Sequence, residues 1–225
     1  MRKNIAMPKI DLYRCYKLIP NHIIIMSRAN ETAKKIGLLL LLGVLNGIGY
    51  KAAQIIKPTG ILVTTWLDSL IPYIAVFVIP YALYVPVVLL PFALYWKDYN
   101  QYRTMALSMI AVLAISVAIF MTFQTYVIRT NVEPTDFFNW GVVFVQSLDA
   151  PVNALPSLHV AMPTLATLFI YLRNRRLAMI VAPVTVLIIL STMFIKQHAV
   201  LDVIAGLILA FAVFKYRHVF EKKKK

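Results

Sequence analysis

Two histidines lie beside residues that suit phosphate chemistry, within a chain that is otherwise strongly apolar. The first, His159, closes a Pro-Ser-Leu-His segment at positions 156–159. Proline suits the first turn of a helix, and the free amides and dipole of that turn attract an anion. Ser157 adds a hydroxyl donor, and His159 can present its imidazole to the same anion. The segment therefore predicts a phosphate-binding helix start.

The second histidine, His198, is followed four residues later by Asp202. On a helix, this spacing places both side chains on one face. A carboxylate there can accept a hydrogen bond from one imidazole nitrogen, which fixes the tautomer and leaves the other nitrogen as nucleophile or base. Arg129 lies just beyond another apolar run, and its guanidinium suits bidentate binding of phosphate.

Each of these residues alone also has an ordinary structural reading. A single histidine or arginine can lie at the membrane interface, and a single aspartate can be a packing partner. Polar residues at the ends of membrane helices are costly, however, and are functional candidates by default. The combination of two histidines, each with a partner suited to phosphate, therefore indicates a phosphoryl-transfer site.

The elements that must position these residues are membrane helices. Hydrophobic residues make up 60% of the 225 residues and charged residues 14%, whereas soluble domains carry about 25% charged residues. Several apolar runs approach the length of about 20 residues that a spanning helix needs. We predict an all-α integral membrane protein, a bundle of six transmembrane helices at residues 36–50, 70–96, 104–124, 156–172, 177–195 and 198–214.

The distribution of Lys and Arg predicts the orientation of this bundle. With residues 1–35, 97–103, 173–176 and the C-terminal tail on one side, that side holds 19 Lys and Arg and the other side holds four. The positive-inside rule then makes both termini cytoplasmic and places the motifs on the extracytoplasmic face. The cytoplasmic segments and loops thus account for the net charge of +14. Because the sequence has no aromatic-basic module, this charge does not indicate nucleic-acid binding.

The same pattern predicts a simple domain organisation. Residues 1–35 form a basic, partly amphipathic cytoplasmic segment, residues 36–217 form the membrane catalytic domain, and residues 218–225 form a basic cytoplasmic tail. The single cysteine, Cys15, excludes a disulfide within the chain. The expected location is the plasma membrane of a bacterium or archaeon, with an endomembrane as the alternative in a eukaryotic cell.

The motifs resemble those of the type 2 phosphatidic acid phosphatase superfamily of integral membrane enzymes. That family has a Lys followed seven residues later by Arg-Pro, then Pro-Ser-x-His, then Ser-Arg followed after five residues by His-x-x-x-Asp. This chain holds the second motif intact at 156–159, and residues 123–129 are similar to the first, with Arg129 as its arginine. The third motif is similar to residues 191–202, with His198 and Asp202 at its histidine and aspartate positions.

The chain departs from the family pattern at three positions. Thr122 stands at the lysine position of the first motif, Thr130 at its proline position, and Thr192 at the arginine position of the third. Two phosphate-binding cations of the family are therefore absent. We expect Lys196 to compensate, since on a continuous helix it lies one turn beyond residue 192. The run 191–202, which includes residues 196–198, looks more like the branch of the superfamily that is related to inositol phosphorylceramide synthases and other lipid phosphotransferases.

The resemblance implies a histidine-dependent, metal-independent enzyme that needs no cofactor. His198 would attack phosphorus and form a phosphohistidine, and His159 would protonate the leaving oxygen. Asp202 would orient His198 and balance its charge. The residues implied to hold the phosphoryl oxygens are Arg129, Ser157 and Lys196.

The expected reaction is hydrolysis of a phosphomonoester or pyrophosphate headgroup of a membrane lipid at the extracytoplasmic face. Transfer of a phosphoryl headgroup to an alcohol acceptor is the main alternative. A second alternative is a metal enzyme whose site is built from the two histidines and Asp202. A third alternative is a non-catalytic lipid-binding or transport protein. The expected partners are the lipid phosphate and the bilayer itself.

Overall fold

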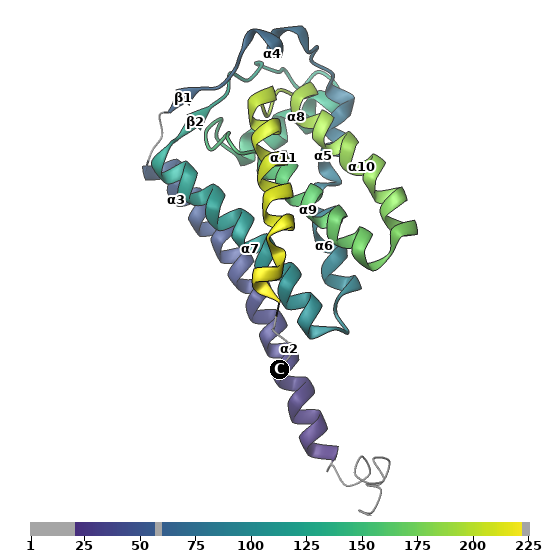
Figure 1. Ribbon diagram of the computed structural model, residues 1–225. Helices are drawn as coiled ribbons and strands as arrows, with labels where there is room; N and C mark the ends of the chain where they lie inside the picture. Colours follow the sequence, from purple (N-terminus) through teal and green to yellow (C-terminus); the bar gives the residue numbers. More distant parts are fainter. Residues whose placement is uncertain (1–20, 57–59, 222–225) are drawn as a thin grey trace, which may run out of the picture.

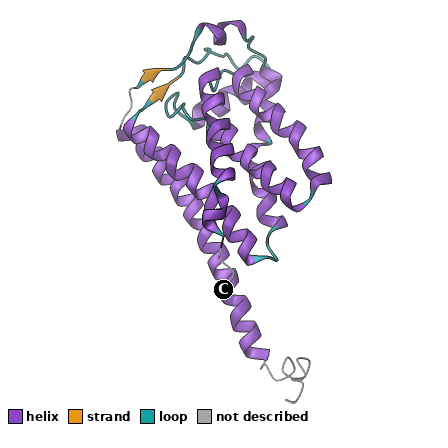
Figure 2. Ribbon diagram, in the orientation of Figure 1, coloured by secondary structure: helices purple, strands orange, loops and turns teal. Residues whose placement is uncertain are grey.

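Figure 1 shows the computed structural model, which describes residues 21–56 and 60–221. Almost all regular structure in these residues is helical (Figure 2). The helices are α2 (Asn21–Val44), α3 (Tyr50–Ile56), α4 (Trp66–Leu70), α5 (Val78–Ala82), α6 (Tyr84–Leu94), α7 (Tyr99–Thr122), α8 (Phe137–Leu148), α9 (Leu158–Arg173), α10 (Arg175–Phe194) and α11 (Val200–Lys215). Short π or 3₁₀ turns are η1 (Leu45–Gly49), η2 (Ala75–Phe77) and η3 (Arg217–Phe220), and the strands are β1 (Ile61–Leu62) and β2 (Thr125–Tyr126).

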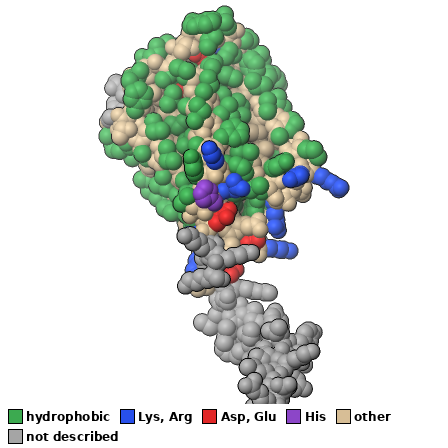
Figure 3. All heavy atoms as spheres, viewed as in Figure 1, with side chains coloured by type: hydrophobic (Ala, Val, Ile, Leu, Met, Phe, Trp, Pro, Cys, Tyr) green, Lys and Arg blue, Asp and Glu red, His purple; other side chains and the backbone are tan. Residues whose placement is uncertain are grey.

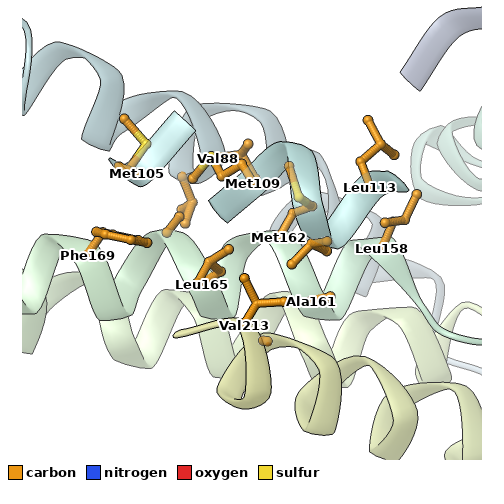
Figure 4. Packing of buried hydrophobic residues seen from close by; sticks show 14 of the residues in the cluster. Val88, Met105, Met109, Leu113, Leu158, Ala161, Met162, Leu165, Phe169 and Val213 are labelled. Atoms are coloured by element: carbon orange, nitrogen blue, oxygen red, sulfur yellow. The ribbon is translucent and has the colours of Figure 1, made fainter. Parts of the chain in front are cut away.

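Helix α9 lies at the centre of the bundle and packs against α6, α7, α10 and α11. Apolar residues follow it on every side, so most of its side chains are buried. Helices that are apolar all round belong in the interior of a bundle. The residues of this core that Figure 4 labels are Val88, Met105, Met109, Leu113, Leu158, Ala161, Met162, Leu165, Phe169 and Val213.

Between membrane helices, exclusion of water contributes little, because lipid tails are as apolar as the side chains. Close packing and dispersion therefore hold this core together. Leu165 and Met109 are fully buried, and each makes many small contacts that an empty space would forfeit.

Four helical segments of the described chain are long and apolar enough to cross a membrane: residues Ala29–Ile56, Ala75–Leu94, Tyr99–Thr122 and Arg175–Phe194. The predicted fourth and sixth spans correspond to α9 and α11, which have 16 residues each. At 1.5 Å per residue each is about 24 Å long, shorter than a hydrocarbon core of about 30 Å. The count of six spans therefore stays a prediction, whereas a mostly helical membrane protein with four candidate spans is established.

The outer surface of the bundle is strongly apolar. Large hydrophobic side chains such as Leu40, Ile180 and Ile208 are exposed by more than 60%. In the view of Figure 3, hydrophobic side chains cover most of the body, while charged side chains gather at the end nearest the C-terminus. A continuous apolar surface of this kind suits contact with lipid rather than water.

Short elements cover the opposite end of the bundle, where the predicted motifs lie. Strands β1 and β2 pair in parallel, with Ile61 opposite Thr125. Gly60 precedes this pair, and a Cβ atom there would lie 2.4 Å from the Gln124 carbonyl oxygen. The close backbone approach therefore requires glycine. Helices α4 and α8, which the sequence analysis did not predict, lie at this end as well (Figure 1).

The structure corrects the predicted starts of two helices that carry the motifs. Helix α9 begins at Leu158 with Ser157 as its N-cap residue, so Pro156 lies before the first turn, and the Leu155–Pro156 peptide bond is cis. Helix α11 begins at Val200, so His198 precedes it.

Helix α10 ends at Phe194, and Lys196 has a positive φ of 57°. The continuous helix assumed through residues 192–196 is therefore wrong. The predicted boundary between the N-terminal segment and the first span, at residues 35 and 36, lies within the uninterrupted helix α2. Residues 1–20 and 222–225, which belong to the predicted terminal segments, fall outside the described residues.

Candidate active site

His198 lies in the turn between α10 and α11. Its backbone amide donates to the Thr192 carbonyl at 3.0 Å, at the end of α10. Its Nδ1 lies 3.4 Å from Oδ2 of Asp202, and the Asp202 side chain is fully buried. The contact between the His198 imidazole and the Asp202 carboxylate, which the four-residue spacing predicts, is therefore present. It leaves Nε2 of His198 free of the carboxylate.

Asp202 also fixes the start of α11. Its Oδ2 accepts a hydrogen bond of 2.8 Å from the Ala199 amide, which satisfies one of the unpaired donors of the first helical turn. Its Oδ1 is buried and has no hydrogen-bond partner among the described residues. The same carboxylate thus caps the helix and contacts His198, so the helix start holds the imidazole.

A backbone contact joins the two histidine motifs. The Ser157 amide donates to the Asp202 carbonyl at 3.1 Å. Gly206 makes this approach achievable, because a Cβ atom at that position would lie 2.7 Å from the Ser157 carbonyl oxygen and 3.0 Å from Cβ of Val160. The N-terminal turns of α9 and α11 are thereby held side by side.

His159 is held by two tyrosines from the second predicted span. The ring stacks on Tyr81, with centroids 4.8 Å apart, and contacts Tyr84 at 4.5 Å. The Tyr81 hydroxyl lies 3.0 Å from Nε2 of His159. The centroids of the His159 and His198 rings are 5.7 Å apart, so the two motifs place their imidazoles close together.

Arg129 reaches this end of the bundle through the loop that follows β2. Its guanidinium donates to the carbonyls of Asp149 at 2.7 Å and Ala150 at 3.3 Å. Its Nε is buried without a partner among the described residues. Burial lowers the pKa of the Arg129 guanidinium, and the Asp149 carboxylate opposes this by raising that pKa. An arginine nevertheless stays protonated in proteins, so Arg129 supplies a fixed positive charge.

Lys196 and Ser157 are placed differently from the sequence expectation. The Lys196 ammonium donates to the carbonyls of Asp68, at 2.9 Å, and Ile71, at the end of α4. Ser157 is fully buried, its hydroxyl has no partner within the described part of the chain, and it lines neither cavity described below. Lys196 therefore has a structural contact of its own, and phosphate binding by either residue stays a prediction.

His198 borders two cavities. Cavity 1, of about 270 Å³, is lined by residues that include Arg129, Lys196 and Asp68. Cavity 2, of about 320 Å³, is lined by residues that include His159 and Asp149. The structure thus brings His198, His159, Arg129 and Lys196 to the walls of two adjoining spaces, with His198 common to both.

Several residues of the site were not found from the sequence. Asp68 accepts from the Val200 amide at 2.8 Å and so provides a second cap for α11. Tyr50 donates to Asp149 at 2.6 Å beside cavity 2. The sequence carries a weak signal for the two tyrosines that contact His159: Tyr81 and Tyr84, three residues apart, bring hydroxyl groups into a proline-rich apolar run.

No group of three or more His, Cys, Asp or Glu residues that could hold a metal ion occurs in residues 21–56 and 60–221. The chain matches the model of the PAP2 superfamily over residues 52–216. This match covers most of the chain and includes both histidine motifs.

The chain belongs to the PAP2 superfamily. No curated protein and no solved structure matches it. The likeness to inositol phosphorylceramide synthases is not tested by this match. Membership in the PAP2 superfamily establishes the general class of phosphatase and phosphotransferase enzymes that act on lipid phosphates.

Proposed function

We propose that this PAP2 member is a membrane lipid phosphate phosphatase that works through a phosphohistidine intermediate at the extracytoplasmic face. One observation carries the proposal: two histidine rings lie 5.7 Å apart at the junction of two cavities, one of which is lined by Arg129 and Lys196. The buried Asp202 contacts the first ring and Tyr81 contacts the second.

In the first step, Nε2 of His198 attacks phosphorus because its Nδ1 faces Asp202. The new bond joins Nε2 to phosphorus, the bond from phosphorus to the leaving oxygen breaks, and His159 donates a proton to that oxygen. Asp202 balances the charge that develops on His198. The negative phosphate favours the protonated form of His159 before transfer.

In the second step, water approaches phosphorus from the side that the leaving group has vacated. Water loses a proton to His159, its oxygen bonds to phosphorus, and the bond to His198 breaks. Each residue returns to its starting state, so one difficult displacement becomes two easier ones. Arg129, Ser157 and Lys196 are the donors proposed to stabilise charge on the phosphoryl oxygens.

Transfer to an alcohol is the second candidate. Cavity 2 measures about 320 Å³, whereas one water occupies about 30 Å³ of liquid. The space beside His159 can therefore hold more than the water that hydrolysis requires, and an alcohol could enter in its place.

The test uses the full chain purified in detergent micelles, with ³²P-labelled phosphatidic acid and a panel of lipid phosphates. We expect release of inorganic phosphate and an acid-labile, base-stable label on the protein, as a phosphohistidine gives. A new phosphodiester lipid with little free phosphate, on addition of an alcohol, would favour transfer. Absence of turnover and label across the panel would favour a non-catalytic lipid-binding protein.

Metal independence is tested in the same assay. The proposed chemistry relies on Arg129 and Lys196 for charge, so activity should be unchanged in excess chelator. Loss of activity with chelator, restored by one divalent cation, would instead support the metal alternative.

A further inference from the structure

We infer that cavity 2 is the subsite for the alcohol part of the substrate, and that Asp149 selects an alcohol carrying a second hydroxyl group beside the reacting oxygen. This inference rests on the proposed function and deepens it. It names a substrate class, a phosphate ester of a diol or polyol, and a specificity-determining residue outside the histidine motifs.

The geometry of displacement at phosphorus places the leaving alcohol in cavity 2. The attacking and leaving atoms of phosphoryl transfer lie roughly in line across phosphorus. With Nε2 of His198 on one side, the leaving oxygen lies on the other, beside the group that protonates it. His159 lines cavity 2 and not cavity 1, so the leaving alcohol belongs in cavity 2.

The two cavities differ in the charge of the residues that line them. Cavity 1 carries Arg129 and Lys196, and its carboxylate, Asp68, is already bonded to the amides of Val200 and Thr65. Cavity 2 instead carries Asp149 and Lys51, whose charges pair and offset one another, so it lacks the excess positive charge of cavity 1. Charge therefore directs the phosphoryl oxygens to cavity 1 and the neutral alcohol to cavity 2.

Asp149 keeps hydrogen-bonding capacity for a substrate hydroxyl. Its Oδ2 accepts from the Tyr50 hydroxyl at 2.6 Å, and its Oδ1 accepts from the Gln54 amide. Lys51 lies 3.7 Å from Oδ1 as an ion pair. A carboxylate offers about four lone-pair sites, so Asp149 is held firmly and can still accept from a hydroxyl of the substrate.

Polar residues from η1 and from the loop before α9 form part of the wall of cavity 2. Asn46 and Gly47 line cavity 2 from η1, a π-helical turn within the first candidate span. Such turns occur frequently at functional sites. Asn153, held by Gln124 and the Tyr50 carbonyl, lines the same cavity. These polar groups line part of a space of about 320 Å³, which is roughly ten times the volume that one water occupies in the liquid.

The test compares two donors that differ by one hydroxyl: 1-oleoylglycerol 3-phosphate and its 2-deoxy analogue, 1-oleoylpropane-1,3-diol 3-phosphate. Both are supplied to the full chain in detergent micelles, and kcat/KM is measured with the amount of phosphohistidine formed. A hydrogen bond to a charged acceptor corresponds to about tenfold or more in rate. We expect wild-type protein to prefer the glycerol ester by at least about tenfold.

The Asp149→Asn variant should lower this preference severalfold or more, because a neutral amide is a weaker acceptor. The ratio of the two donors within one variant cancels any loss of folded protein. Glu133→Gln, an exposed carboxylate in the loop before α8, is the matched control and should keep the wild-type ratio.

Two outcomes would overturn the inference while the proposed function stands: equal kcat/KM for the two donors in wild-type protein, or an unchanged preference in Asp149→Asn. In both cases phosphohistidine still forms. Absence of phosphohistidine with every donor is a different result, because it overturns the proposed function itself and the inference with it.

Discussion

At the level of single residues, the two histidines differ in what holds their rings. A buried carboxylate contacts His198, whereas hydroxyl and ring contacts from two tyrosines hold His159. An imidazole next to a carboxylate is the better nucleophile, because the carboxylate stabilises the cation formed by attack. The other ring, held by neutral groups, suits proton transfer to the leaving oxygen.

This difference predicts distinct effects of two substitutions. His198→Ala should abolish the phosphoenzyme, since the nucleophilic nitrogen is gone. His159→Ala should slow formation of the phosphoenzyme by about 10²- to 10⁴-fold, the usual contribution of a general acid, while the label still forms on His198. Rapid-quench labelling with ³²P lipid measures both. Label that maps to His159 in wild-type protein would reverse the two roles.

Lys196 combines a structural contact with a proposed phosphate contact. Its ammonium donates to two carbonyls near α4 and also lines cavity 1. Lys196→Met should raise KM about tenfold to a hundredfold if the ammonium also binds phosphate, because such a bond contributes roughly 1.5–3 kcal/mol. It should also lower the unfolding temperature, since the two carbonyls lose their donor.

The matched control is Lys97→Met, an exposed lysine away from both cavities. A lower unfolding temperature with unchanged KM in Lys196→Met would leave the lysine a purely structural role.

At the level of the elements, the close approach of α11 to the start of α9 decides the site. The Ser157 amide and the Asp202 carbonyl meet there, and the absence of a side chain at Gly206 permits it. The two histidines are 39 residues apart in the sequence (198 − 159), so this contact, rather than either helix alone, brings His159 near His198.

Gly206→Ala should therefore disturb both folding and activity. A methyl group 2.7 Å from the Ser157 carbonyl oxygen forces the helices apart, and overpacking of this kind costs about 1–3 kcal/mol. Thermal unfolding in detergent should show the loss of stability, and lipid phosphate turnover should fall with it.

The control for this prediction is Gly43→Ala in α2, where an added Cβ meets nothing within 4 Å. It should be neutral or slightly stabilising, because alanine favours a helix over glycine by about 1 kcal/mol. Equal stability of the Gly206→Ala and Gly43→Ala variants would contradict the importance of the close approach.

At the level of the whole molecule, charge and apolar surface are arranged along one axis. Charged side chains gather at the end nearest the C-terminus, and the motifs lie at the opposite end with β1, β2 and α4 (Figures 1 and 3). One predicted side of the membrane holds 19 Lys and Arg and the other holds four. The positive-inside rule then predicts that the site faces away from the cytoplasm.

Cysteine labelling tests this topology. In a Cys15→Ser background, Glu133→Cys should react with a membrane-impermeant maleimide added outside intact cells, whereas Gln101→Cys should react only after permeabilisation. Both positions are exposed. Labelling of residue 133 only from the cytoplasmic side would place the site on the inner face and contradict the proposed orientation.

The sequence by itself determined the class of this protein and pointed to the histidine motifs whose catalytic role is proposed. Apolar runs need a bilayer, and the spacing of His198 and Asp202 is local, so four residues of chain bring their side chains into contact. The start of α11 was predicted less well, because capping contacts from Asp68 and Asp202 decide where this helix begins.

Only the tertiary structure decided which distant groups surround the histidines. Tyr81, Tyr84 and Asp149 come from other segments, and their rings and carboxylate give no periodic signal in an apolar sequence. The tertiary structure also decided that the Lys196 ammonium contacts the Asp68 carbonyl. Lys196 lies in a turn with positive φ and not in a helix. Local spacing reports neighbours within one turn, whereas a cavity is defined by helices that meet only when the bundle packs.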